Sequence, residues 1–407
     1  MKRAVLWLCA ALFALGGAEA QPRSDPAELG FSATGLMVLD ARLQARIDNG
    51  DFPGAVLLVA RRGHIAHLSA LGALREDGPE MPQDAIFRIY SMTKPITSAA
   101  AMMLVEEGRL NLEAPVHDYL PSFRNMRVVS AAGEEESRRP MTVLDLLRHT
   151  SGLTYELYGE GPARAALAAE NMEGGALSNS EVADTLARLP LEHHPGEVWE
   201  YGRSTDLLGA LIETVEGRML GEVLGARIFA PLGMKDTGFG PVGPADRHRL
   251  AEANADDMNI GAYPMFDPEK PRAFQSGGGG LVSTAHDYAR FAQMLMNGGE
   301  LDGVRLLSPA SVEMMTTNQL DAEIGPGSGD IPRPGVGFGL GFSVRTGETG
   351  APAIGSIGEY WWAGATGTYF WADPEEELFV IFLMQAPSQR NAIPTLLHGL
   401  VYGAMGE

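Results

Sequence analysis

The order in which strand-like and helix-like patterns follow one another limits the folds that this chain can form. Near the N-terminus the sequence predicts a helix over residues 35–49 and then two strands, 54–60 and 65–71, joined by a tight turn. From about residue 91 to residue 320 the apolar spacing is mainly helical. Strand patterns then return at 337–345, 368–372 and 378–384, and a last helix is predicted near 393–405.

Strands leave unpaired backbone groups along their edges, so these distant segments need each other as partners. We therefore predict one sheet that is assembled from both ends of the chain around a helical insertion. The predicted domain division follows this pattern. An αβ part covers about residues 28–95 and 335–407, and a helical part covers about residues 96–334.

The first 20 residues have the pattern of a secretory signal peptide. Basic Lys2 and Arg3 precede an apolar run over residues 4–15, and small residues surround the expected cleavage site after Ala20. The apolar run is shorter than the roughly 20 residues that a membrane-spanning helix needs. We expect a mature chain, residues 21–407, that is periplasmic or secreted and has no membrane span.

Charge and cysteine content exclude several classes of function. The formal net charge is −21, so a nucleic-acid backbone would be repelled, and we expect no nucleic-acid partner. Cys9 is the one cysteine and lies within the predicted signal peptide. The mature chain would then have no disulfide, no cysteine-bound metal and no thiolate nucleophile. No metal or cofactor motif is found, so we expect neither, and catalysis would have to use oxygen and nitrogen groups.

A serine and a lysine spaced by three residues form the strongest chemical signal. Ser91 and Lys94 stand at the predicted start of a helix that continues to about Gly108, where residues three apart share one face. Burial can lower the pKa of a lysine so that its neutral amine acts as a base, which arginine cannot do. The alternative interpretation is a serine that caps the helix beside a solvated lysine. Ser-x-x-Lys alone cannot separate the two.

Two further motifs follow in the chain and complete a known pattern. The three motifs are Ser91-Met92-Thr93-Lys94, Tyr201-Gly202-Arg203-Ser204 and Trp362-Ala363-Gly364-Ala365. In order and approximate spacing the chain resembles the serine β-lactamases and penicillin-binding proteins, most of all class C β-lactamases and family VIII carboxylesterases. The resemblance implies an α+β fold in which an antiparallel sheet flanked by helices lies beside an all-α domain, with the active site between them.

The resemblance also implies a role for each motif residue. Ser91 would be the nucleophile, and Lys94 and Tyr201 would exchange its proton. Backbone amides of Ala365 and Ser91 would form the oxyanion hole. The substrate-binding residues implied by the motifs are Gly364, Ala365, Trp362 and Arg203.

Two motif positions differ from β-lactam enzymes and bear on the substrate. Trp362 replaces a cation that would meet the carboxylate of a β-lactam, and Arg203 replaces an asparagine that usually contacts the acyl amide. A tryptophan offers an apolar face, which favours small neutral esters over anionic lactams and peptides. Arg203 could instead restore a positive charge to the pocket.

We therefore expect a carboxylesterase that acts through an acyl-enzyme on a small-molecule ester. The first alternative is a β-lactamase or a peptidase of the D-alanyl-D-alanine type, with a lactam or peptide substrate. The second is a non-catalytic, penicillin-binding-like sensor domain, because two motif residues are missing.

Overall fold

A seven-stranded antiparallel sheet forms the centre of the protein. The computed structural model describes residues 21–157, 159–170, 172–329, 331–349 and 354–406; the predicted signal peptide lies outside these ranges. The strand order is β13-β14-β15-β16-β17-β1-β2. Their bounds are β1 Gly54–Arg61, β2 His64–Gly72, β13 Val336–Phe338, β14 Ser343–Arg345, β15 Tyr360–Ala363, β16 Tyr369–Asp373 and β17 Leu378–Met384.

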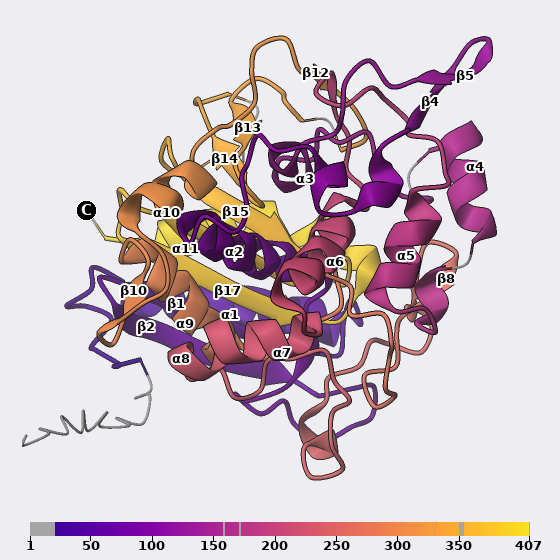
Figure 1. Cartoon of the computed structure of the whole chain (residues 1–407). Coiled ribbons are helices and arrows are strands. Elements are labelled where there is room, and N and C mark those ends of the chain that lie inside the picture. Colours follow the sequence, from indigo (N-terminus) through magenta and orange to yellow (C-terminus); the bar gives the residue numbers. More distant parts are fainter. Residues whose placement is uncertain (1–20, 158, 171, 330, 350–353, 407) are drawn as a thin grey trace, which may run out of the picture.

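The two ends of the chain meet in the middle of this sheet. β1 pairs with β17 along its length, from Ala55 opposite Met384 to Arg61 opposite Leu378. Both strands are almost wholly buried, which explains their continuous apolar sequences, since helices cover both faces of the sheet (Figure 1). The prediction of one sheet built from both chain ends is confirmed.

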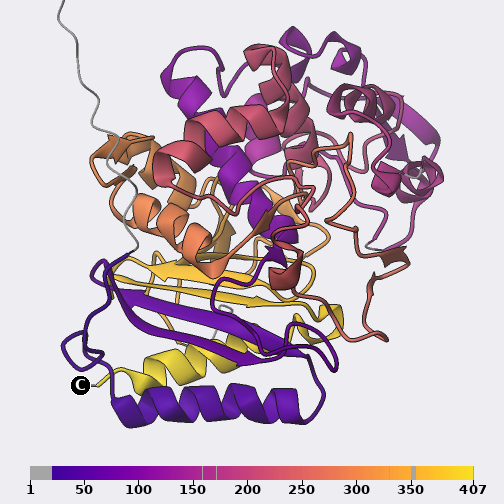
Figure 2. The same cartoon turned by 90° about the horizontal axis from the view of Figure 1, so that it is seen from below.

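Side chains alternate along β1 between two separate cores. Val56 and Leu58 face the large helical part, whereas Leu57 and Val59 face the helices α1 and α11. α1 spans Ala33–Asp48 and α11 spans Ile393–Ala404. Figure 2 shows these two helices together under one face of the sheet and the helical part above the other face. The α+β fold implied by the resemblance is therefore confirmed.

The segment between β2 and β13 supplies the remaining helices. The longest are α2 Thr93–Glu106, α6 Ser204–Glu216 and α9 Ala285–Met296, and α9 lies against β1 and β17. Shorter helices are α3 Val143–Leu147, α4 Pro162–Ala169, α5 Asn179–Leu186, α7 Leu220–Leu224, α8 Ala230–Leu232 and α10 Pro309–Thr316. Within the described ranges, no helix has both the length and the apolar character to cross a bilayer.

Short strands pair within and between the loops of this helical part. They are β3 Phe87–Arg88 with β9 Val282–Ser283, β4 Arg127–Ser130 with β5 Gly133–Glu136, β6 Val198–Trp199 with β12 Gly325–Pro326, β7 Asn259–Ile260 with β8 Tyr263–Pro264, and β10 Glu300–Leu301 with β11 Val304–Arg305. The helical pattern of the sequence did not predict them, because strands of two to four residues are too short for a measurable period.

The prediction of a single strand over residues 337–345 is wrong. The segment is a hairpin, β13 and β14, whose connection contains Gly339 and Gly341. Gly341 has a φ of 99°, which a glycine adopts without strain, and a Cβ at Gly339 would lie 2.1 Å from the Met315 carbonyl oxygen. The apolar residues continue through this turn, so the hydrophobic pattern conceals the reversal.

Candidate active site

Ser91 lies in a 3₁₀ turn, Tyr90–Met92, immediately before α2. The prediction that Ser91 begins the α-helix itself is wrong by two residues, since this 3₁₀ turn precedes α2, which begins at Thr93. Tyr90, the residue before Ser91, has a φ of 41°, outside the helical region. A positive φ at a residue other than glycine costs about 1 kcal/mol or more and must be held by its surroundings. The Tyr90 hydroxyl accepts a hydrogen bond from the Phe266 amide at 3.2 Å, and the two rings pack against each other.

Lys94 lies in the first turn of α2 with its side chain fully buried. Its Nζ is 3.2 Å from Ser91 Oγ, as the spacing of three residues predicted. It also lies 3.2 Å from Tyr155 Oη and 2.7 Å from the Gly278 carbonyl oxygen. The alternative of a solvated lysine is excluded for this residue by its burial. The amine is held directly against the hydroxyl that it would have to deprotonate.

Tyr201 completes a continuous row of polar atoms. Its hydroxyl donates to Ser91 Oγ at 2.7 Å, and its ring lies under Lys94 Nζ at 4.6 Å from the ring centre. Burial raises the pKa of the Tyr201 phenol well above its usual value, and the hydrogen bond with Ser91 opposes this only in part. Tyr201 is therefore a neutral phenol near pH 7, and Lys94 is the better candidate for the resident base.

Two tyrosines touch this row, and their replacement should have unequal effects. We predict that Tyr201→Phe lowers kcat by roughly 10²-fold, because the donor to Ser91 Oγ is lost. Tyr155→Phe removes a hydroxyl that contacts Lys94, and we expect roughly a tenfold loss, since Lys94 keeps its other partners. Steady-state turnover of an aryl ester by both variants measures the difference. Equal losses would contradict a direct role of Tyr201 at the nucleophile.

Sequence reasoning missed Tyr155 and the Gly278 carbonyl as partners of Lys94. Tyr155 follows the short segment 149–153, and Gly278 lies within the short segment 277–281; both segments accompany the three motifs. Neither residue belongs to a regular pattern of spacing that would have marked it in the sequence. Asp206 holds the second segment, since its Oδ1 accepts from Ser276 Oγ at 2.5 Å and from the Gly278 amide at 3.0 Å. Gly277 passes so close to Thr205 that a Cβ would lie 2.6 Å from its carbonyl oxygen.

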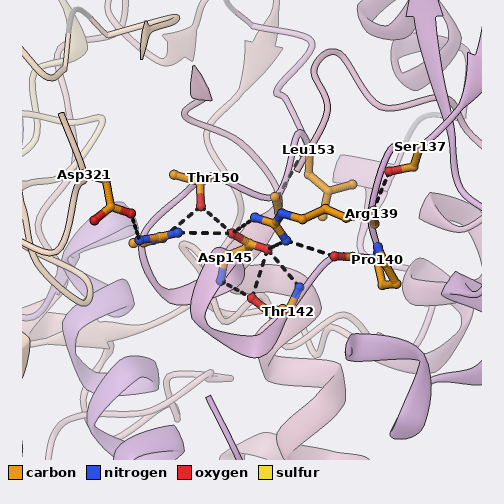
Figure 3. Close-up of polar contacts among 10 residues, drawn as sticks. Ser137, Arg139, Pro140, Thr142, Asp145, Thr150, Leu153 and Asp321 are labelled. Carbon is orange, nitrogen blue, oxygen red and sulfur yellow. Dashed lines mark hydrogen bonds and ion pairs between the residues drawn. The ribbon is translucent and has the colours of Figure 1, made fainter. Parts of the chain in front are cut away.

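A buried carboxylate fixes the segment that leads to Tyr155. This carboxylate belongs to Asp145, which Figure 3 shows at the centre of a cluster of polar contacts. Arg139 donates two hydrogen bonds to it, at 2.6 and 2.9 Å. The backbone amide and hydroxyl of Thr142 and the hydroxyl of Thr150 also donate to Asp145. Because Thr150 lies in the turn after α3, these bonds set the path of the chain toward Leu153 and Tyr155.

Glu200 fixes Tyr201 from the preceding position. Its buried carboxylate accepts hydrogen bonds from Arg164 and Thr154, both at 2.6 Å, and from the Ser328 hydroxyl at 2.7 Å. Burial alone would raise the pKa of the Glu200 carboxyl, but hydrogen bonds from His193, Thr154 and Ser328 outweigh it and lower the pKa to about 2.

The lowered pKa makes a prediction about stability at acid pH. The ionised Glu200 stabilises the fold fully above the ordinary carboxyl pKa of 4.5, and this contribution is lost as the pH falls toward about 2. We expect Glu200→Gln to lower the free energy of unfolding at pH 7 by about 3 kcal/mol. Urea unfolding of both proteins from pH 7 to pH 2.5 measures this, and the difference should shrink below pH 4.5. A difference that does not change with pH would contradict the assignment.

The end of β15 lies beside the segment that carries Ser91. Thr368 Oγ1 donates to the Ile89 carbonyl oxygen, and a Cβ at Gly364 would lie 2.5 Å from that same oxygen. Only glycine at position 364 allows this close approach. Ala365 therefore lines the same cavities as Ser91, and no described residue accepts a hydrogen bond from its backbone N–H. This position is suitable for the predicted oxyanion hole.

The two positions that differ from β-lactam enzymes have different surroundings. The half-buried Trp362 ring packs edge-on against Tyr201 and Phe338 and lines a cavity next to Ser91. Arg203 is buried, and carboxylates neutralise its charge, since Glu156 lies 2.6 Å and Asp206 3.4 Å from its guanidinium. The idea that Arg203 restores a net positive charge to the pocket is therefore wrong. The spacing of the motifs could not show Glu156 as its partner.

Ser91 and Tyr201 lie where two cavities meet. The first, which we call the aromatic chamber, has a volume of about 290 Å³, and its walls include Tyr90, Tyr155, Leu157, Tyr263, Met265 and Phe266. The second, which we call the arginine chamber, has a volume of about 460 Å³, and its walls include Arg333, Trp361, Trp362, Arg390, Asn391 and Thr395. A bond held at Ser91 can thus extend a different group into each chamber. Six of the seven predicted site residues line one or both chambers, namely Ser91, Tyr201, Arg203, Trp362, Gly364 and Ala365. The seventh, Lys94, is buried and contacts Ser91 Oγ.

A sheet of this topology with a Ser-x-x-Lys nucleophile turn is typical of serine acyl-transfer enzymes of the penicillin-recognising type. The Beta-lactamase family model matches residues 39–398, and the chain belongs to that family. It is 37% identical to Protein Rv1367c of Mycobacterium tuberculosis, over 85% of this chain and 88% of that protein. It is 32% identical to Esterase EstB of Burkholderia gladioli, over 88% of this chain and 93% of that protein. The solved structure of EstCE1, described as a hydrolase with promiscuous acyltransferase activity, superimposes with a TM-score of 0.76 at 27% identity and covers 91% of this chain and 99% of that one.

Proposed function

We propose that this hydrolase of the beta-lactamase family is an exported carboxylesterase that cleaves small esters through an acyl-enzyme on Ser91. The observation that carries the proposal is the contact of Ser91 Oγ with both Lys94 Nζ and Tyr201 Oη at the junction of two chambers. A nucleophile, a base and a proton donor within hydrogen-bond distance are the groups that acyl transfer requires.

The proposed reaction has two halves. Ser91 Oγ attacks the ester carbonyl while its proton passes to the Lys94 amine, and the carbonyl oxygen becomes an oxyanion between the amides of Ser91 and Ala365. The proton then returns through Lys94 or Tyr201 to the departing alcohol oxygen, and the ester C–O bond breaks. Water then attacks the acyl carbon, and its proton passes to Lys94 or Tyr201. That proton moves on to Ser91 Oγ as the bond between Ser91 and the acyl group breaks, which releases the carboxylic acid and restores Ser91.

Trp362 and the relatives named as esterases, at 31–32% identity, support an ester, whereas relatives at 27% identity are named as putative D-alanyl-D-alanine carboxypeptidases. An apolar ring stands at the position where a β-lactam enzyme would present a cation, and Arg203 is neutralised by Glu156 and Asp206. Of the similar proteins, EstB is named as an esterase and EstCE1 as a hydrolase.

The test offers the purified mature protein a short-chain aryl ester, a chromogenic cephalosporin and a D-Ala-D-Ala peptide. We expect saturable turnover of the ester and little of the other two. Turnover of the cephalosporin or of the peptide without the ester would replace the esterase by a β-lactamase or a peptidase. No turnover of any of them would favour a binding domain.

A further inference from the structure

Arg203, the third residue of the second motif, lies between two acidic side chains. Its buried guanidinium pairs with Glu156 at 2.6 Å and with Asp206 at 3.4 Å. Both acids are also buried, with exposed side-chain fractions of 3% and 1%. We call these three residues the Arg203 cluster. Buried charges of this kind add little net stability, so the value of the cluster has to be sought in what it holds in place.

The Arg203 cluster holds both segments that contact the Lys94 amine. On one side the guanidinium lies over the Tyr155 ring, 4.8 Å from its centre, and Tyr155 Oη is 3.2 Å from Lys94 Nζ. On the other side Asp206 accepts a hydrogen bond from the Gly278 amide at 3.0 Å. The carbonyl oxygen of Gly278 lies 2.7 Å from the same amine. Two polar partners of Lys94 are therefore held by groups that contact Arg203.

The cluster also places charge beside the catalytic row. Its two acids face one cation, so the loss of either sign leaves an imbalance in a buried site. Burial raises the pKa of the Tyr201 phenol most, and the negative charge of Asp206 raises it further, so charge in the cluster acts on the row. A change in the charge of the cluster should therefore alter how readily Lys94 takes up a proton.

Other ionisable groups surround Lys94 on the elements packed against it. Its Nζ contacts Tyr155 Oη and lies over the Tyr201 ring. His149 packs against Tyr201, and burial lowers the pKa of this histidine well below its usual value, with a further lowering by the charge of Lys94. The charged groups around the site outside the cluster are Glu200, Arg272 and Arg390. All of these groups are retained in the variants described next.

Resting on the proposed esterase function, we propose that Arg203 is a positioning residue for the base Lys94. It orients the amine through Tyr155 and Gly278. Its positive charge offsets the two acids of the cluster, which would otherwise favour the protonated amine. Arg203 thus has a different task from the asparagine that it replaces, which contacts the acyl amide in β-lactam enzymes.

The test is the pH dependence of kcat/KM for a short-chain aryl ester, because activity falls at acid pH as the base takes up a proton. Glu156→Gln removes a negative charge, which opposes protonation of the base. We expect the acid-side midpoint of the profile to move down by about one pH unit. Arg203→Met leaves the two acids in excess, and the midpoint should move up by about the same amount. The double variant should return toward the wild-type midpoint.

Arg203→Lys separates charge from geometry. Lysine keeps the positive charge but lacks the planar fork that reaches both acids. The midpoint should stay where it is in the wild type, while kcat falls roughly tenfold because the amine is less well oriented. The matched control is Glu376→Gln, which makes the same change in the pair with Arg61, also at 2.6 Å, and lines neither chamber. This control should leave the profile unchanged.

Two results would overturn the inference while leaving the esterase intact. One is a midpoint that stays in place or moves up in Glu156→Gln, a result that does not depend on whether Arg203→Met folds. The other is an Arg203→Lys variant with the kcat of the wild type. If the wild-type protein cleaves no ester at any pH, the proposed function fails, and this inference fails with it.

Discussion

Replacing Ser91 by alanine is expected to lower kcat for an aryl ester by roughly 10⁴-fold or more, because no other group can form the covalent intermediate. Ser91 is half-buried in a turn and its Oγ accepts from Lys94 and Tyr201. The variant loses one oxygen atom and should keep the fold. Stopped-flow measurement of alcohol release would show neither a burst nor a steady state above background.

Ser122→Ala is the matched control for this change. Ser122 is exposed in the short turn Pro121–Phe123, away from both chambers, and we expect full activity. Ester turnover retained by Ser91→Ala at more than a few per cent would mean that another residue is the nucleophile.

Replacing Lys94 by methionine is expected to lower kcat by roughly 10³-fold, since the proton of Ser91 would have no amine to accept it. Methionine has nearly the length of lysine and can occupy the fully buried site. The variant leaves the buried Gly278 carbonyl without its donor, so we expect the melting temperature to fall modestly while the protein stays folded. Low activity together with an intact fold separates a catalytic role from a structural one.

Lys270→Met makes the same change at an exposed lysine that pairs with Asp267 at 3.0 Å. It should leave both kcat and the melting temperature unchanged. The assignment of Lys94 would be wrong if Lys94→Met retained activity comparable with this control.

Much of the fold could be predicted, because long apolar segments have a clear period. The strand over 378–384 has the predicted bounds, and the N-terminal hairpin turns at Arg62 and Gly63, both with positive φ. The hairpin turn between β13 and β14, which contains Gly339 and Gly341, was hidden by continuous apolar sequence. Short paired strands such as β3 and β9 depend on contacts between distant segments, which no local pattern encodes.

The candidate site was predicted where motifs mark it and missed where long-range contacts complete it. Ser91, Lys94 and Tyr201 meet as predicted. Tyr155 belongs to no motif, and its contact with Lys94 arises from packing. The positive charge of Arg203 is balanced by Glu156, which lies 47 positions away in sequence. Likewise Arg333 and Arg390 line one chamber although they lie far apart in sequence. The division into two parts near residues 95 and 335, the signal peptide and the export remain predictions.

The central claim is that the Ser91 hydroxyl is the activated nucleophile, and covalent labelling tests it most directly. The mature protein is treated with an aryl phosphonate that reacts with activated serines, digested, and analysed by peptide mass spectrometry. The account predicts one stoichiometric adduct on the peptide that contains Ser91, and much slower labelling in Lys94→Met. An unlabelled Ser91 peptide under conditions in which the protein hydrolyses esters, or an adduct on another residue, would contradict it.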